Sequence, residues 1–91
     1  MDYKTILKAA STLKKEQRIT EACDLLLELS LSSAYSELTL SEKLKIPLYL
    51  QADKRSDAAW RFLNEINCSP EYFDVFSQAT IAEKMLSFLK Q

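Results

Sequence analysis

The stretch that decides the fold, Arg18–Leu29, reads RITEACDLLLEL, and 37 residues later Arg55–Ile66 reads RSDAAWRFLNEI. Both copies begin with Arg, carry Ala at the fifth position and carry Leu at the ninth. Repetition at a spacing of roughly 20–50 residues is typical of stacked helical arrays. We therefore predict two helical hairpins followed by a closing helix. Further identities occur at the same offset: Leu7 and Leu44, Lys8 and Lys45, Leu13 and Leu50, Tyr35 and Tyr72.

The composition favours an all-α chain that forms one small domain. The 91 residues include no Gly and two Pro, and 47% of them are hydrophobic. Tight strand hairpins depend on residues with positive φ, which Gly supplies most easily. We expect a single helical-repeat domain over residues 1–91, with one repeat at about 3–33, a second at about 39–68, and a C-terminal helix at about 70–90.

Several classes of function are disfavoured by what the composition lacks. The chain has no His, so it has neither a Ser-His-Asp triad nor a His metal ligand, and without Gly it has no phosphate-binding loop. We expect no catalytic activity, no metal and no cofactor. A net charge of −1 gives no general attraction for nucleic acid. We predict a cytoplasmic protein without membrane segments, in which Cys23 and Cys68 are small buried hydrophobic residues.

Apolar residues recur at helical spacing along most of the chain. We predict helices at about 2–15, 19–31, 39–53 with a kink or short break at Pro47, and 57–67 with Asp57 as its cap. The segment 71–90 forms one helix or two that break near 78–80, with Phe73 and Phe88 off its main stripe. The expected core stripe of the first segment is Ile6, Ala9, Ala10 and Leu13, and that of the second is Ala22, Leu25, Leu26 and Leu29. The fourth segment has Ala59, Phe62, Leu63 and Ile66. The last segment has Tyr72, Val75, Phe76, Ala79, Ala82, Met85, Leu86 and Leu89.

These positions resemble the tetratricopeptide repeat, a pair of antiparallel helices in about 34 residues with small residues where the helices cross. Ala22 and Ala59 match the small residue early in the second helix, and Ala10 matches that of the first helix. The chain departs from the family pattern at five positions: Ile6 and Lys43 replace the first-helix aromatic, Pro47 replaces the second small residue, and Gln17 and Lys54 stand where Gly is common. The resemblance implies a short array that binds proteins or peptides in a groove lined by its first helices.

Three surfaces are candidates for partner binding in such an adaptor. The groove implied by the resemblance carries Lys4, Lys8, Ser11, Lys15, Ser41, Lys45 and Leu48, which would suit an acidic peptide. The alternative is the face that carries Glu21, Asp24 and Glu28, which would suit a basic partner. Trp60 is a binding hot spot if it is exposed, and a core residue packed on the closing helix if it is not. The apolar residues on two faces of the C-terminal helix also suggest self-association.

Two alternatives remain open from the sequence. The small size and the acidic stripe would suit an immunity or antitoxin protein that neutralises a toxin by masking it. The segment Thr39–Pro47 also looks like the first helix and turn of a helix-turn-helix regulator. In that case residues 48–61 would form a DNA-recognition helix that offers Gln51, Lys54, Arg55 and Arg61.

Overall fold

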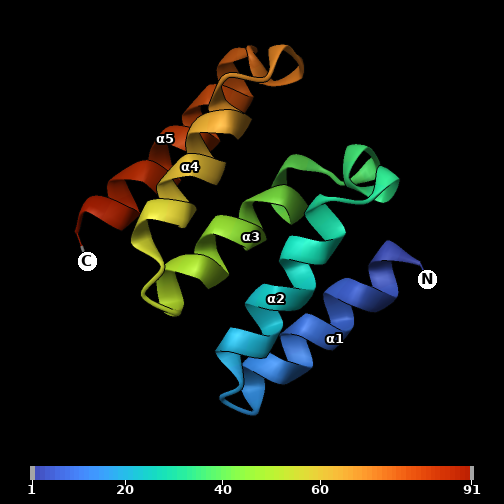
Figure 1. The fold of residues 1–91 in the computed structure, drawn as a ribbon. Helices are drawn as coiled ribbons and strands as arrows, with labels where there is room; N and C mark the ends of the chain where they lie inside the picture. The colour runs from blue at the N-terminus through green and yellow to red at the C-terminus, as the bar shows by residue number, and fades with distance from the viewer. Residues whose placement is uncertain (1, 91) are drawn as a thin grey trace.

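A computed structural model describes residues 2–90, and within them the chain is helical with no strand. Figure 1 shows two antiparallel hairpins, α1 with α2 and α3 with α4, followed by α5 behind α4. A short 3-10 helix follows each hairpin: η1 comes after α2, and η2 comes after α4. The bounds are α1 Tyr3–Lys15, α2 Ile19–Ser30, η1 Ser33–Glu37, α3 Leu40–Ala52, α4 Ser56–Asn67, η2 Pro70–Tyr72 and α5 Val75–Leu89.

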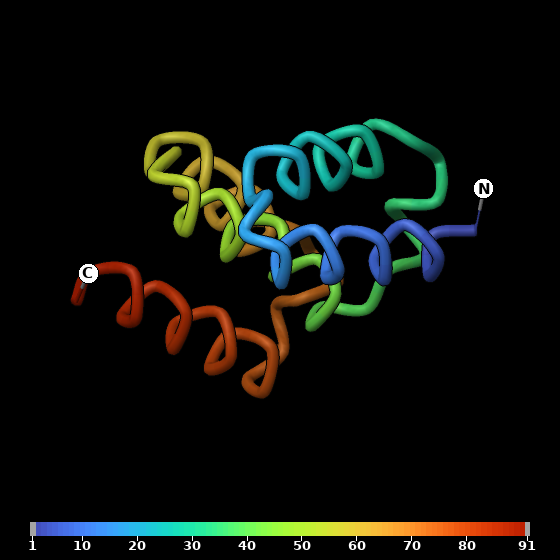
Figure 2. Tube along the Cα trace, turned by 90° about the horizontal axis from the view of Figure 1, so that it is seen from below, coloured from blue at the N-terminus to red at the C-terminus, as the bar shows by residue number. Residues whose placement is uncertain are grey.

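Packing is strongest within each hairpin, and α2 packs on α3 to join the two. The core includes small residues on the paired helices: Ala10 of α1, Ala22 of α2 and Ala59 of α4 are all buried. Small side chains let two helix axes approach closely, because no large group separates the backbones. The stacked hairpins with a C-terminal helix agree with the architecture predicted from the sequence repeat. Figure 2 shows α5 at the outside of the molecule.

The two hairpin turns have the same geometry, 37 residues apart. Gln17 and Lys54 both lie in the left-handed region, with φ of 63° and 62°. The N–H of Arg18 donates to the carbonyl of Leu13 over 2.8 Å, and that of Arg55 donates to Leu50 over 2.9 Å. The left-handed conformation costs a residue with a Cβ roughly 1–2 kcal/mol, a strain that Gly avoids. The turns therefore fall where the sequence predicts them, but they are made without glycine.

Replacing Gln17 or Lys54 with Gly is expected to stabilise the protein by about 0.5–1 kcal/mol, because the relief of left-handed strain exceeds the added entropy of the unfolded chain. Glu16→Gly is the matched control, since Glu16 in the same turn has a φ of −84° that any residue accepts. We expect this control to lose about 0.5–1 kcal/mol. Urea unfolding followed by circular dichroism measures all three, and a loss of stability in both turn variants would contradict the assignment of strain.

Two expectations about individual helices are corrected. Helix α3 runs through Pro47 without the short break, because Ile46, Pro47 and Leu50 are fully buried and their packing offsets the hydrogen bond that Pro47 cannot donate. A complete capping box of Thr39 and Glu42 stabilises the start of the same helix. Helix α4 begins at Ser56, so Asp57 lies inside its first turn and is not its cap.

Some residues that were expected in the core are exposed or only partly buried. In α1, Leu7 is buried and Ala9 is exposed, because the buried stripe is rotated by part of a turn. Leu25 and Phe62 are only partly buried. Cys23 is buried as expected, and burial raises the pKa of its thiol to about 11, but Cys68 is exposed just after α4 ends.

The last segment departs furthest from the prediction. The chain breaks at Phe73 and Asp74, earlier than 78–80, because Asp74 caps α5 by accepting the N–H of Ser77 over 2.9 Å. The residues of α5 that pack inward are Ser77, Ile81 and Phe88. The predicted stripe is largely exposed instead: Val75 is 87% exposed, Phe76 79%, Leu86 58% and Leu89 71%.

Candidate functional site

A groove of about 330 Å³ lies between α3 and α5. Its apolar lining comes from Leu44, which is buried, and from Leu48, which is half-buried. Each helix adds one lysine, Lys45 from α3 and Lys84 from α5. The remaining lining residues are polar: Ser41, Thr80 and Glu83. An apolar groove is a common site for an amphipathic helical segment of a partner.

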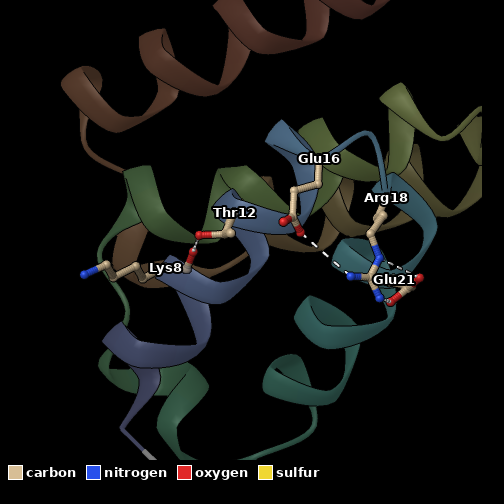
Figure 3. A network of polar contacts seen from close by, with 5 residues as sticks. All are labelled: Lys8, Thr12, Glu16, Arg18 and Glu21. Carbon is tan, nitrogen blue, oxygen red and sulfur yellow. Dashed lines mark hydrogen bonds and ion pairs between the residues drawn. The ribbon is translucent and has the colours of Figure 1, made fainter.

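The structure separates the lysines that the sequence grouped together. Three residues of the predicted groove, Ser41, Lys45 and Leu48, line this groove, which lies between α3 and α5 and not along the two first helices. Lys4, Lys8 and Lys15 are exposed on α1 and lie outside its lining. Figure 3 shows Lys8 extended away from the helix, near Thr12, whose hydroxyl donates to the Lys8 carbonyl over 3.1 Å.

Arginines at the hairpin turns partly neutralise the acidic stripe on α2. Arg18 donates from Nε to Glu21 over 3.0 Å and lies 3.8 Å from the carboxylate of Glu16, as Figure 3 shows. Arg55 reaches across from the second hairpin to Asp24, over 3.4 Å, and pairs with Asp53 over 2.9 Å. Of the three carboxylates predicted to form the stripe, two therefore already have a cationic partner within the chain.

Glu28, the third member of the stripe, faces a different surface. It lines a hollow of about 320 Å³ between the start of α1 and the end of α2, together with apolar groups of both helices. The three acidic residues therefore lie on one helix but do not act as one uniform negative surface.

Trp60 holds α5 against α4. Its indole is partly buried and meets the ring of Phe88 edge-on, with the ring centroids 5.8 Å apart. Edge-to-face aromatic pairs contribute about 0.5–1.5 kcal/mol beyond their buried area. The geometry matches the alternative in which Trp60 packs on the closing helix, and only part of the side chain is left for a partner.

A buried lysine is the polar feature that the sequence did not reveal. The side chain of Lys43 is 5% exposed, and its Nζ lies 3.0 Å from Glu71 Oε1. The same Nζ lies 5.0 Å from the ring centroids of both Tyr35 and Tyr72. Burial alone lowers the pKa of Lys43, but hydrogen bonds with Tyr72 and Glu71 outweigh it and raise the pKa above its usual value. The ammonium therefore stays charged and ties η1 and η2 to α3.

The interpretation as a helix-turn-helix does not fit the helix boundaries. It requires a turn near Pro47 and one helix over residues 48–61. In the structure α3 continues to Ala52, a tight turn follows, and α4 begins at Ser56. The residues proposed to read DNA therefore do not share one helix: Gln51 lies in α3, Lys54 and Arg55 lie in the turn, and Arg61 lies in α4.

The described part of the chain contains no group of three or more side chains placed to hold a metal ion. Over the same residues, no helix is long and apolar enough to span a lipid bilayer. Comparison of the chain with known protein families, with curated proteins and with solved structures gives no match.

Proposed function

We propose that this chain is a non-catalytic protein-interaction module that binds an acidic segment of a partner protein in the groove between α3 and α5. The observation that carries the proposal is the lining of that groove, in which Leu44 and Leu48 are flanked by Lys45 and Lys84. The resemblance of the hairpins to tetratricopeptide repeats supports the same role, since that family binds peptides along its first helices.

The chemistry of the lining defines the kind of ligand. Apolar side chains of the partner would pack on the two leucines, and its carboxylates would pair with the two lysines. Glu83 on the same helix as Lys84 disfavours a partner that is acidic at every position. The preferred ligand is therefore a short amphipathic segment in which acidic residues alternate with apolar ones.

Reversing both groove charges, with Lys45→Glu and Lys84→Glu together, is expected to weaken binding by at least about tenfold, which corresponds to ~1.4 kcal/mol. Selection of short peptides from a random display library against the wild-type chain supplies the ligands, and isothermal titration measures their affinity. Both lysines are on the surface of their helices, so the variant should retain its helical circular dichroism.

The matched control is Lys4→Glu with Lys8→Glu, the same change of charge on α1. Groove binding predicts that this control loses less than about threefold, through long-range electrostatics only. Equal losses in the two variants would mean that binding depends on overall charge and would contradict the groove. Selection of peptides rich in Lys and Arg would favour the acidic face of α2 instead.

The second candidate is an immunity or antitoxin protein that masks a basic toxin with Glu21, Asp24 and Glu28. The ion pairs of Arg18 and Arg55 make this face less negative than the sequence suggested. Reversing the three carboxylates to lysine is the variant that would reveal such a partner, by abolishing protection against it.

A further inference from the structure

Helix α5 has a second apolar face that no other described residue covers. Five residues, spaced alternately by four and three, form what we call the outer seam: Val75, Ala79, Ala82, Leu86 and Leu89. All five are exposed, whereas the inward residues Ser77, Ile81 and Phe88 lie on nearly the opposite side of the helix. Apolar residues that recur on average every 3.5 positions form the contact line of paired helices. The outer seam therefore has the pattern of a helix that packs against another helix.

We propose that the outer seam pairs with the outer seam of a second copy of this chain, in antiparallel orientation and centred on Ala82. Ala82 is the middle residue of Val75–Leu89, with seven helical residues on either side. A two-fold axis at this point places Val75 of one copy opposite Leu89 of the other. The seam is then complementary to itself, because small residues lie near the axis and large residues lie towards both ends.

The small residues near the axis have a precedent within the same fold. Both hairpins pack closely around buried alanines: Ala10 and Ala22 in the first, and Ala59 in the second. Ala79 and Ala82 offer α5 the same opportunity for close approach, but they are exposed. A second copy supplies the missing helix without requiring any rearrangement of the hairpins.

The charges at the ends of α5 favour the antiparallel orientation. Phe76, Glu83 and Lys90 are spaced by seven residues, so they lie along one edge of the seam. In the antiparallel pair this edge faces itself, which brings Lys90 of the second copy to the exposed ring of Phe76 for a cation–π contact. The positive end of each helix dipole also lies beside the negative end of the other. A parallel pair would place like ends together.

The same geometry limits the strength of the dimer. Glu83 approaches its counterpart near the axis, and like charges at such a position repel. The helix is about 22 Å long, and a stable interface usually takes about 800 Å² from each partner, more than a single helix of this length is expected to supply. We expect reversible self-association in the micromolar range, with no dependence on the α3–α5 groove.

Ala82→Glu is expected to weaken self-association by at least about tenfold, because it buries two carboxylates at the axis of the pair. Ala9→Glu is the matched control, since it makes the same change at an exposed alanine of α1. Sedimentation equilibrium over a range of concentrations measures both. A wild-type chain that stays monomeric throughout, or a control that dissociates as much as Ala82→Glu, would overturn the proposal.

Disulfide trapping tests the orientation. In a Cys68→Ser background, an equal mixture of Val75→Cys and Leu89→Cys chains is expected to form mainly the mixed disulfide under mild oxidation. Two chains that both carry Val75→Cys should not cross-link, because antiparallel pairing places their sulfurs roughly 21 Å apart along the axis. Efficient cross-linking of that variant with itself would indicate parallel pairing and would contradict the proposed symmetry. The groove variant Lys45→Glu with Lys84→Glu should dimerise normally, so the seam and the groove can fail independently.

Discussion

Phe88→Ala is expected to lower the free energy that holds α5 in place by about 3–5 kcal/mol, the usual cost of removing a buried phenylalanine ring. Phe88 is 4% exposed and packs edge-on against Trp60. Helix α5 has few other inward groups: Ile81 is buried, and Met85 is only partly so. Losing the ring should therefore release α5 while the two hairpins remain folded.

Native-state hydrogen exchange distinguishes this local release from global unfolding. In Phe88→Ala the amides of α5 should lose protection, while those of α1–α4 keep most of theirs. Phe73→Ala is the matched control: it removes the same ring from a position that is 62% exposed, and it should cost less than about 1 kcal/mol. Equal effects of the two substitutions would mean that Phe88 does not anchor the helix.

Glu71→Ala is expected to destabilise the protein by about 2 kcal/mol, because it leaves the buried ammonium of Lys43 without its carboxylate. This value is below the roughly 3–5 kcal/mol of a fully buried pair, because the side chain of Glu71 is 57% exposed. The exposed Glu37 provides the control, and Glu37→Ala should cost less than about 0.5 kcal/mol. Chemical denaturation of these variants measures the differences.

A compensating substitution at Lys43 tests whether the ion pair with Glu71 is what stabilises this region. Lys43→Met replaces the buried charge with an apolar side chain of similar length, a change that is often close to neutral in stability. Combined with Lys43→Met, Glu71→Ala should lose most of its effect, because there is no longer an ammonium to leave unpaired. If the two substitutions are simply additive, the ion pair is not what stabilises this region.

The pH dependence of stability follows from the same cluster. The pKa of Lys43 is raised in the folded protein, so its contribution is fully present below the pKa of an unfolded lysine and is lost as the pH rises through the folded pKa. Burial also raises the pKa of Tyr35, because it favours the neutral phenol. Ionisation of Tyr35 therefore lowers the stability of the folded protein as the pH rises, as for Lys43. The buried thiol of Cys23, whose pKa is raised to about 11, adds a loss that begins earlier. Stability should therefore fall above about pH 9, and the part of the fall above about pH 10 should be smaller in Lys43→Met.

The sequence predicted the hairpins because their signals are local. Helical spacing of apolar residues identified the paired helices, and the repeated Arg18 and Arg55 located the two turns. The capping-box pattern of Thr39 and Glu42 predicted the start of α3, and both hydrogen bonds of the box are present in the structure. The helical spacing and the capping box depend on residues within a few positions of one another, and the repeat is found by comparing two stretches of sequence. No tertiary information is needed to recognise these features.

The orientation of α5 could not be obtained in the same way. This helix is apolar on two sides, and periodicity identifies a stripe but does not say which stripe meets the core. The contact between Trp60 and Phe88 determines which side of α5 faces the core, and these two residues are far apart in the chain. The sequence consequently named only the α3 side of this groove, with Ser41, Lys45 and Leu48, and it did not name Thr80, Glu83 and Lys84 of α5.

The site around Lys43 was missed for a related reason. The equivalence of Tyr35 and Tyr72 was visible as a repeat, but their convergence on one lysine depends on how successive hairpins stack. A lysine at the position of an aromatic residue was the available signal. Its meaning required the two 3-10 turns to be placed in space.

The short turns within the hairpins also affect how quickly the chain folds. Each hairpin joins helices that are neighbours in sequence, so most of the packing forms without closing a long loop. Chains with such low contact order fold within microseconds to milliseconds, because little loop entropy is lost before the first contacts form. Either hairpin can therefore serve as the starting point, and α5, with the fewest inward groups, is the element expected to dock last.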